Sequence, residues 1–153
     1  MLKPGDEAPD FTLADQNGEP VTLSESLKQR KASHLLFFYP KADTPGCTTQ
    51  ACGLRDALPE LGETAVVGIS PDAPGAQAAF DEKFGLGFPL LSDPEHAVAD
   101  AYGVWGDKSM YGRTYQGVIR SAFLVDEQGT VAEAWYKISP KDTPKKLLKA
   151  LAE

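Results

Sequence analysis

The residues of this sequence that are best suited to covalent chemistry are its two cysteines, Cys47 and Cys52. Cys47 follows a Pro-Gly break, at a point where a helix is expected to begin after a buried strand. The first N–H groups of a helix lack intrahelical partners and favour an anion such as a thiolate. The position therefore predicts a nucleophile at Cys47 rather than an inert buried thiol. For Cys52 the spacing alone leaves open whether the side chain faces the core or reacts with Cys47.

A helix terminus alone cannot ionise such a thiol. A free thiol of pKa about 8.5 is only ~3% ionised at pH 7, and reaching ~90% requires ~3.4 kcal/mol. The helix dipole supplies ~0.3–1 kcal/mol, or up to ~2 kcal/mol when partly buried. A cation at ~4 Å supplies about 4 kcal/mol at an effective dielectric constant of ~20. We therefore expect a cationic partner for Cys47.

Arg120 is the first candidate for this partner, because it interrupts an apolar strand expected over residues 118–125. An arginine within a core strand requires a partner. The alternative is a strand-end arginine that pairs with one of the many carboxylates. If Arg120 is not the partner, Arg113 and Lys41 are the next candidates.

Length and composition limit the class of protein. The 153 residues, 42% hydrophobic and 24% charged, fit one globular domain over residues 1–153. The longest apolar run, residues 35–39, is strand-sized, and the first residues lack the apolar core of a signal peptide, so we expect a cytoplasmic protein that does not bind membranes. The net charge of −7 argues against nucleic-acid binding. Two cysteines and two histidines are too few for a disulfide scaffold or a zinc site, and His34 and His96 are expected to serve packing or the surface.

Alternating strand and helix signals predict an α/β fold in which helices cover a mixed central sheet. An Asn-Gly turn predicts an N-terminal β-hairpin, and Ser24 is expected to cap the first helix. The glycine-rich residues 103–117 are expected to form an irregular loop. The expected strands are residues 10–13, 20–23, 34–39, 65–69, 88–91, 118–126 and 130–137, and the expected helices are residues 24–31, 47–61, 76–84, 96–102 and 142–151.

The run Pro40-x-x-x-Thr44-x-x-Cys47 resembles the active-site signature of peroxiredoxins. Residues 39–56 are similar to peroxiredoxin Q, also called bacterioferritin comigratory protein. Other segments resemble the same family in the expected order, so the resemblance covers essentially the whole chain: residues 4–13, 68–72, 91–93, 102–106 and 120–126. It implies a thioredoxin-like fold and thiol-dependent reduction of hydrogen peroxide and organic hydroperoxides.

The resemblance also implies a role for each residue of the motif. Cys47 would be the peroxidatic nucleophile and Cys52 the resolving cysteine, with an intramolecular disulfide between them. Pro40 would shield the pocket, the Thr44 hydroxyl would position peroxide or thiolate, and Arg120 would lie near the thiolate. Thioredoxin or a similar dithiol would recycle the enzyme, which would be a monomer that needs no metal, flavin or haem.

Two other functions remain as alternatives. A general disulfide oxidoreductase of thioredoxin type would require Cys-x-x-Cys, and the four residues between Cys47 and Cys52 argue against it. A redox sensor whose disulfide switches a partner interface is not excluded by the sequence. Comparing insulin reduction with peroxide consumption distinguishes a general disulfide oxidoreductase from a peroxidase. Catalytic turnover with thioredoxin and excess peroxide would make the redox-sensor hypothesis unnecessary.

Overall fold

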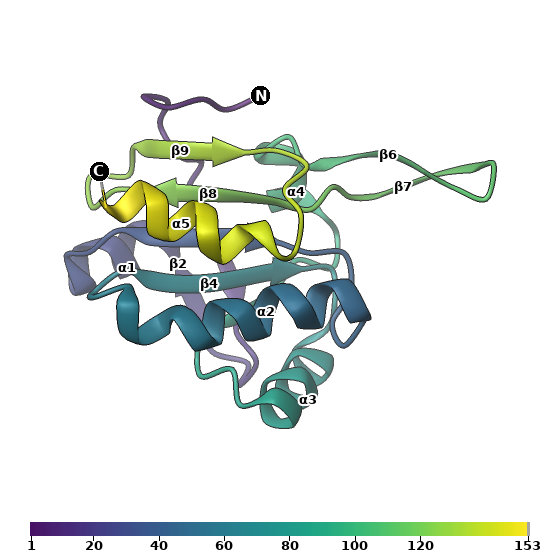
Figure 1. Cartoon of the computed structure of the whole chain (residues 1–153), viewed down its shortest axis with the longest axis horizontal. Helices are drawn as coiled ribbons and strands as arrows, with labels where there is room; N and C mark the ends of the chain where they lie inside the picture. The colour runs from purple at the N-terminus through teal and green to yellow at the C-terminus, as the bar shows by residue number, and fades with distance from the viewer. Residues whose placement is uncertain (153) are drawn as a thin grey trace.

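The computed structural model describes residues 1–152, except the side chain of Met110. Seven strands form one mixed sheet in the order β2-β1-β5-β4-β3-β8-β9, and helices cover it (Figure 1). This architecture confirms the predicted α/β class. The strands of the sheet are β1 (Thr12–Ala14), β2 (Pro20–Thr22), β3 (His34–Phe38), β4 (Ala65–Ser70), β5 (Leu90–Ser92), β8 (Ser121–Val125) and β9 (Val131–Trp135), and the helices are α1 (Leu23–Arg30), α2 (Pro45–Ala57), α3 (Pro74–Phe84), α4 (Ala97–Ala101) and α5 (Asp142–Ala152).

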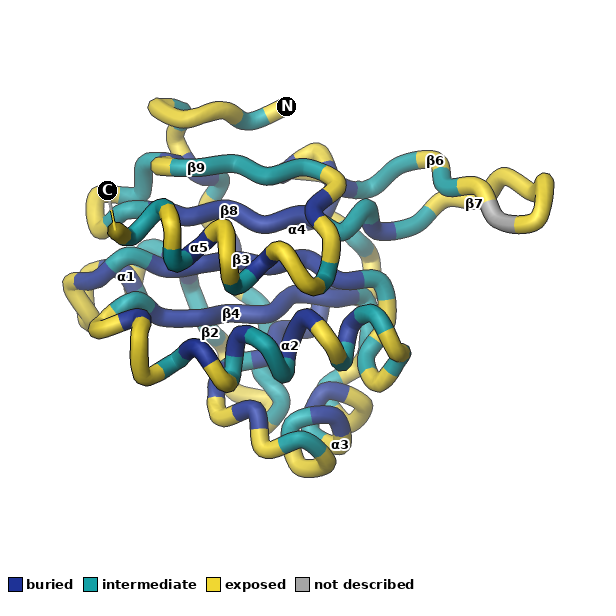
Figure 2. Tube along the Cα trace, in the orientation of Figure 1, coloured by how far each residue is buried: buried dark blue, intermediate teal, exposed yellow. Residues whose placement is uncertain are grey.

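The centre of the sheet consists of β3, β4 and β8, in which every residue is buried (Figure 2). Strand β3 pairs in parallel with β4 and antiparallel with β8. Because side chains alternate along a strand, Leu36 and Phe38 pack in one core with α1 and α4. Leu35 and Phe37 pack in a second core with α2, α3 and α5. These two cores hold the carboxyl end of β3, from which the chain runs into α2.

The predicted N-terminal hairpin is confirmed, since β1 pairs antiparallel with β2. The prediction of Ser24 as a helix cap is wrong, because α1 begins at Leu23 and Thr22 occupies the capping position. The Asp10 carboxylate instead accepts hydrogen bonds from the N–H and the hydroxyl of Ser24, at 2.9 and 2.7 Å. An acceptor 14 residues earlier in the chain thus replaces the local cap. Within residues 1–152 no helix has the length and apolarity that a bilayer crossing requires.

The prediction of an irregular loop over residues 103–117 is also wrong. Strand β6 (Trp105–Met110) pairs antiparallel with β7 (Arg113–Val118) in a separate two-stranded sheet. Tyr111 and Gly112 form the turn, and both have positive φ, 53° and 76°. Two consecutive positive φ values are typical of the type I′ turns that close tight hairpins. In Figure 1 this hairpin extends well beyond the rest of the fold.

Candidate active site

Cys47 lies in the first turn of α2, close behind β3. The helix begins two residues earlier than predicted, at Pro45, because proline is well suited to the first helical position. It ends at Ala57, and a 3₁₀ turn over Leu58–Glu60 replaces the predicted continuation to residue 61. Cys47 is only 1% exposed. Its thiol therefore lies near backbone N–H groups that have no acceptors within the helix.

Arg120 contacts Cys47 and is the cationic partner that ionisation of the Cys47 thiol was expected to need. Its Nη1 lies 3.4 Å from Cys47 Sγ. Contrary to the sequence prediction, Arg120 is not inside a strand, because β8 begins only at Ser121. Its carbonyl accepts a hydrogen bond of 2.9 Å from the N–H of Ile138, which fixes the backbone. The half-buried guanidinium extends from the residue just before β8 to the first turn of α2.

Gln50 is a part of the site that the sequence analysis missed. It is fully buried, and its Oε1 accepts a 2.8 Å hydrogen bond from the same Arg120 Nη1. Its Nε2 donates to Thr143 Oγ1 at 2.9 Å, and Thr143 in turn donates to the Ser139 carbonyl at 2.9 Å. Gln50 lies three residues after Cys47, on the same helix face. A polar side chain on this buried face is the sequence signal that could have indicated it.

Gly46 allows Arg120 to approach the helix closely. A Cβ at this position would lie 3.0 Å from Arg120 Nη2 and 3.6 Å from Pro140 Cγ. A surface cavity of about 400 Å³ adjoins this glycine. Residues from the first turns of α2 and from the segment leading into α5 line it: Pro45, Gly46, Thr49, Ser139, Pro140, Lys141 and Asp142.

The other residues predicted for the site lie on the same stretch of chain. Pro40 is half-buried just after β3, and Thr44 occupies the N-cap position of α2. The Thr44 hydroxyl donates to the Lys41 carbonyl at 2.8 Å instead of capping the helix. Cys52 is half-buried on the same helix as Cys47, and both thiols are free.

Lys108 of β6 is a second cation near this site that the sequence analysis missed. Its Nζ donates to the Val118 carbonyl at 2.9 Å. Burial, and then the charge of Arg120, lowers the pKa of Lys108, whereas Cys47 acts in the opposite direction. The charges of Arg120 and Cys47 thus both act on the Lys108 ammonium. Lys108 could not be predicted as part of the site while residues 103–117 were expected to form an irregular loop. Its position depends on the pairing of β6 with β7.

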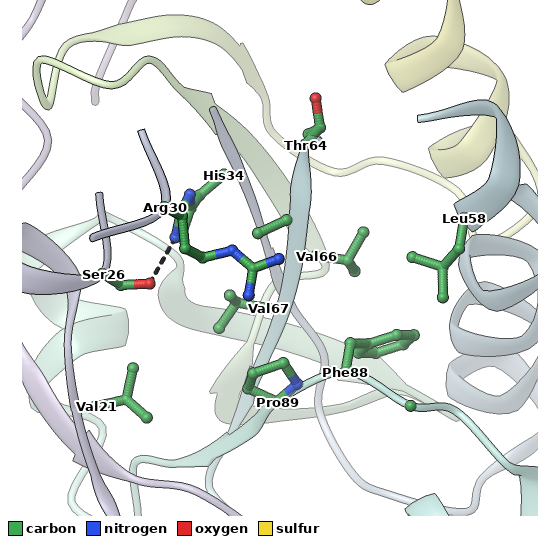
Figure 3. Close-up of a pocket in the computed structure, with 12 residues that line it drawn as sticks. Val21, Ser26, Arg30, His34, Leu58, Thr64, Val66, Val67, Phe88 and Pro89 are labelled. Carbon is green, nitrogen blue, oxygen red and sulfur yellow. Dashed lines mark hydrogen bonds between the residues drawn. The ribbon is translucent and has the colours of Figure 1, made fainter. Parts of the chain in front are cut away.

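The histidines lie elsewhere. His34 borders a cavity of about 120 Å³ between α1 and the sheet, which contains none of the residues predicted for the site (Figure 3). Its Nε2 bonds to Ser26 Oγ at 2.7 Å and its Nδ1 to the Ala32 carbonyl at 3.0 Å. Burial lowers the pKa of His34. His96 stacks on Trp105, with ring centroids 3.9 Å apart. The expectation that the histidines serve packing and the surface fits these contacts.

A cysteine in the first turn of a helix, held against an arginine beside a mixed sheet, is the setting of a reactive thiolate and suits a thiol-dependent redox enzyme. Residues 4–134 match the AhpC/TSA family model, so the chain belongs to this family. It is 52% identical over 143 residues to the putative peroxiredoxin bcp of Haemophilus influenzae, covering 92% of this chain and 90% of that protein. It is also 52% identical over 132 residues to peroxiredoxin Bcp of Escherichia coli, covering 85% and 83%.

Solved structures give the same result. Peroxidoxin BcpB of Mycobacterium tuberculosis has a TM-score of 0.87 at 37% identity, covering 99% of this chain and 97% of that one. The bacterioferritin comigratory protein of Xanthomonas campestris, described for its alkyl peroxide reduction activity, has a TM-score of 0.83 at 32% identity, covering 93% and 90%. These comparisons confirm the family resemblance, the thioredoxin-like fold and the class of activity, which is that of a thiol peroxidase.

Proposed function

We propose that this enzyme reduces hydrogen peroxide and organic hydroperoxides through a Cys47 sulfenic acid and an intramolecular disulfide with Cys52, which thioredoxin or a similar dithiol reduces. The observation that carries the proposal is the contact of 3.4 Å between Arg120 Nη1 and Cys47 Sγ in the first turn of α2. A guanidinium at this distance, together with free helix N–H groups, stabilises a thiolate and the negative charge that develops during its attack.

In the first step the Cys47 thiolate attacks one oxygen of the hydroperoxide. The S–O bond forms as the O–O bond breaks, and the other oxygen leaves as hydroxide or alkoxide. This ion takes up a proton, equivalent to the one that the Cys47 thiol lost on ionisation, and becomes water or alcohol. Arg120 stabilises the charge on the leaving oxygen. The Thr44 hydroxyl donates its own proton to the Lys41 carbonyl, so its oxygen is available to accept a hydrogen bond from the peroxide O–H. Pro40 shields the reacting atoms from water.

In the second step the Cys52 thiol attacks the sulfenic sulfur and water leaves, which forms the disulfide. The two cysteines lie five positions apart on one helix. Helix geometry places their Cα atoms roughly 8–9 Å apart with side chains about 140° apart. A disulfide requires Cα atoms within about 7 Å and converging side chains. Resolution therefore requires part of α2 to unwind.

The proposal includes the setting of the enzyme. Residues 1–153 act as one domain, because strands from both halves of the chain share one sheet. The enzyme works as a monomer, since both cysteines belong to one helix of one chain. It acts in the cytoplasm, where dithiol reductants keep such disulfides transient. The thiol chemistry above requires no metal or organic cofactor.

Stopped-flow reduction of peroxide by the reduced protein, followed by mass spectrometry, tests the proposal. Cys47→Ser abolishes the reaction, because a hydroxyl is not ionised near neutral pH. Cys52→Ser consumes about one peroxide per chain and stalls as a sulfenic acid that a dimedone-type probe traps. Normal thioredoxin-dependent turnover by Cys47→Ser would overturn the assignment. Efficient insulin reduction without peroxide consumption would instead support a general disulfide oxidoreductase.

A further inference from the structure

The β6–β7 hairpin presents aromatic side chains to solvent. Tyr111 at the turn is 98% exposed, and Tyr115 of β7 is 42% exposed. A two-stranded hairpin is marginally stable alone, and this one extends away from the main sheet (Figure 1). Exposed tyrosines on a projecting element are typical of surfaces that bind another protein.

The turn itself carries conformational strain. Tyr111 has a φ of 53°, a region that side chains other than Asn, Asp and Gly rarely adopt. Asn-Gly would close the same turn at lower energetic cost. A bulky aromatic residue in this conformation is a local strain of the kind found at functional sites.

The two faces of the hairpin differ. Cross-strand pairing places Lys108 opposite Tyr115. Arg113 lies two residues before Tyr115 on the same strand, so its side chain is on the same face of the hairpin. We call Lys108, Tyr115 and Arg113 the basic stripe. The opposite face carries the uncharged Ser109 and Thr114, and also Asp107 and Gln116. The stripe therefore combines two cations with an aromatic ring.

The basic stripe begins at the active site and runs outward. Lys108, at its inner end, donates to the Val118 carbonyl at 2.9 Å, two residues before the Arg120 that contacts Cys47. The base of the hairpin is anchored by the stacking of Trp105 on His96, with rings 4° from parallel. The Ile119 N–H also donates to the Val104 carbonyl at 2.7 Å. These contacts hold the base of the hairpin against the rest of the fold.

We propose that the basic stripe and Tyr111 form the docking surface for the protein dithiol that reduces the enzyme, and that they bind an acidic face of that protein. The inference rests on the proposed function. Each strand of the hairpin has six residues, which span roughly 20 Å. This length suits a protein and far exceeds a peroxide of a few atoms. The exposed Arg113 selects an acidic partner. The inner end of the stripe lies beside the segment that carries Arg120 to Cys47, which the partner must reach.

The reaction at this surface is thiol–disulfide exchange. A thiolate of the partner attacks one sulfur of the Cys47–Cys52 disulfide, forms a mixed disulfide and expels the other sulfur as a thiolate. The second thiol of the partner then attacks the mixed disulfide. The partner leaves with its own disulfide, and its two electrons and two protons restore both thiols of the enzyme.

Tyr111→Ser and Arg113→Glu test the proposal, with Lys28→Glu on the exposed surface of α1 as a control of equal charge change. Turnover is measured with a bacterial thioredoxin, its reductase and NADPH, and separately with dithiothreitol. We expect both hairpin variants to raise the KM for thioredoxin at least tenfold. Stopped-flow peroxide reduction and dithiothreitol-driven turnover stay within twofold of the unmodified enzyme, and the control variant keeps its KM.

Other results would contradict the docking surface. An unchanged KM for thioredoxin in both hairpin variants overturns it. An equal loss with dithiothreitol or in the peroxide step also overturns it, because the hairpin would then act in folding or chemistry. If sedimentation shows a dimer that Tyr111→Ser dissociates without a change in the KM for thioredoxin, the occupant is a second copy of this chain. A failure of the unmodified protein to consume peroxide would refute the proposed function instead.

Discussion

Replacing Arg120 by methionine tests how the thiolate is stabilised. Methionine keeps much of the apolar length of the side chain and removes the charge that lies 3.4 Å from Cys47 Sγ. At this distance and an effective dielectric constant of ~20, the Coulomb attraction is about 5 kcal/mol. Solvent screens the half-buried guanidinium, and measured hydrogen bonds to charged groups contribute only ~1.5–3 kcal/mol. We therefore expect peroxide reduction to slow by roughly 10- to 150-fold.

The assay has two readouts. Absorbance near 240 nm, followed against pH in the Cys52→Ser background, reports the thiolate of Cys47, and stopped-flow mixing with peroxide reports the rate of attack. Arg30→Met on α1 is the matched control, because it removes the same charge far from the site. Arg120→Lys is measured as well, since it keeps a cation and should retain part of the rate. Thermal unfolding checks that each variant folds.

The reasoning would fail on a specific result. If Arg120→Met folds and both the thiolate absorbance and the rate remain those of the unmodified enzyme, the guanidinium does not stabilise the thiolate. Lys108 would then be the cation to replace next. A loss of stability without a loss of rate would assign Arg120 to the support of Gln50, whose buried Oε1 it satisfies.

Three further predictions follow from the same geometry. Gly46→Ala places a Cβ 3.0 Å from Arg120 Nη2, so we expect a severalfold slower reaction with peroxide, measured by stopped flow, at unchanged or higher melting temperature. Oxidation to the disulfide should unwind residues 47–56, which hydrogen exchange on matched reduced and oxidised samples measures. Burial lowers the pKa of His34 in the folded chain, so the unfolded chain binds more protons below about pH 6.5. The free energy of unfolding should therefore fall as pH drops through this range, and His34→Gln should weaken that dependence in urea titrations.

Each of these predictions has a contrary outcome. An unchanged peroxide rate in Gly46→Ala would mean that the arginine can move without cost. Equal exchange protection of residues 47–56 in both redox states, with the disulfide confirmed by mass, would exclude unwinding. An identical pH dependence with and without His34 would assign the acid sensitivity to other groups.

The cysteine site could be predicted to a large extent from the sequence. The free energy required to ionise a thiol at a helix terminus exceeds what the helix dipole supplies, so a cation is needed. Arg120 is the cation that stands out in the sequence, because it interrupts an apolar segment. The prediction of the pair succeeded even though the strand assigned to residues 118–125 was wrong at its start. The chemistry of a thiolate depends on the distance to the charge and not on the secondary structure that carries it.

Other parts of the site could not be predicted in the same way. Gln50 is neutral, so an argument about charge does not find it, and its role depends on Thr143, which is 93 residues away in the chain. Lys108 was missed because the four glycines of residues 103–117 indicate a loop. Two of them, Gly106 and Gly117, in fact face one another across the hairpin. Glycine has a low strand propensity, and here the pairing between two strands outweighs it. Such pairing joins residues that are apart in the sequence, so local composition does not reveal it.

The packing of α2 against α5 has a consequence for damage by excess peroxide. A Cβ at Gly53 would lie 2.9 Å from Pro144 Cγ, and Gln50 bonds to Thr143. On the proposed route, the unwinding of residues 47–56 therefore has to break these contacts with α5 before Cys52 reaches the sulfenic acid. During that interval a second peroxide can oxidise the sulfenic acid to the sulfinic acid. The contacts between α2 and α5 thus set how long the sulfenic acid remains open to a second peroxide. Tighter packing between the two helices would make the enzyme easier to inactivate by its own substrate.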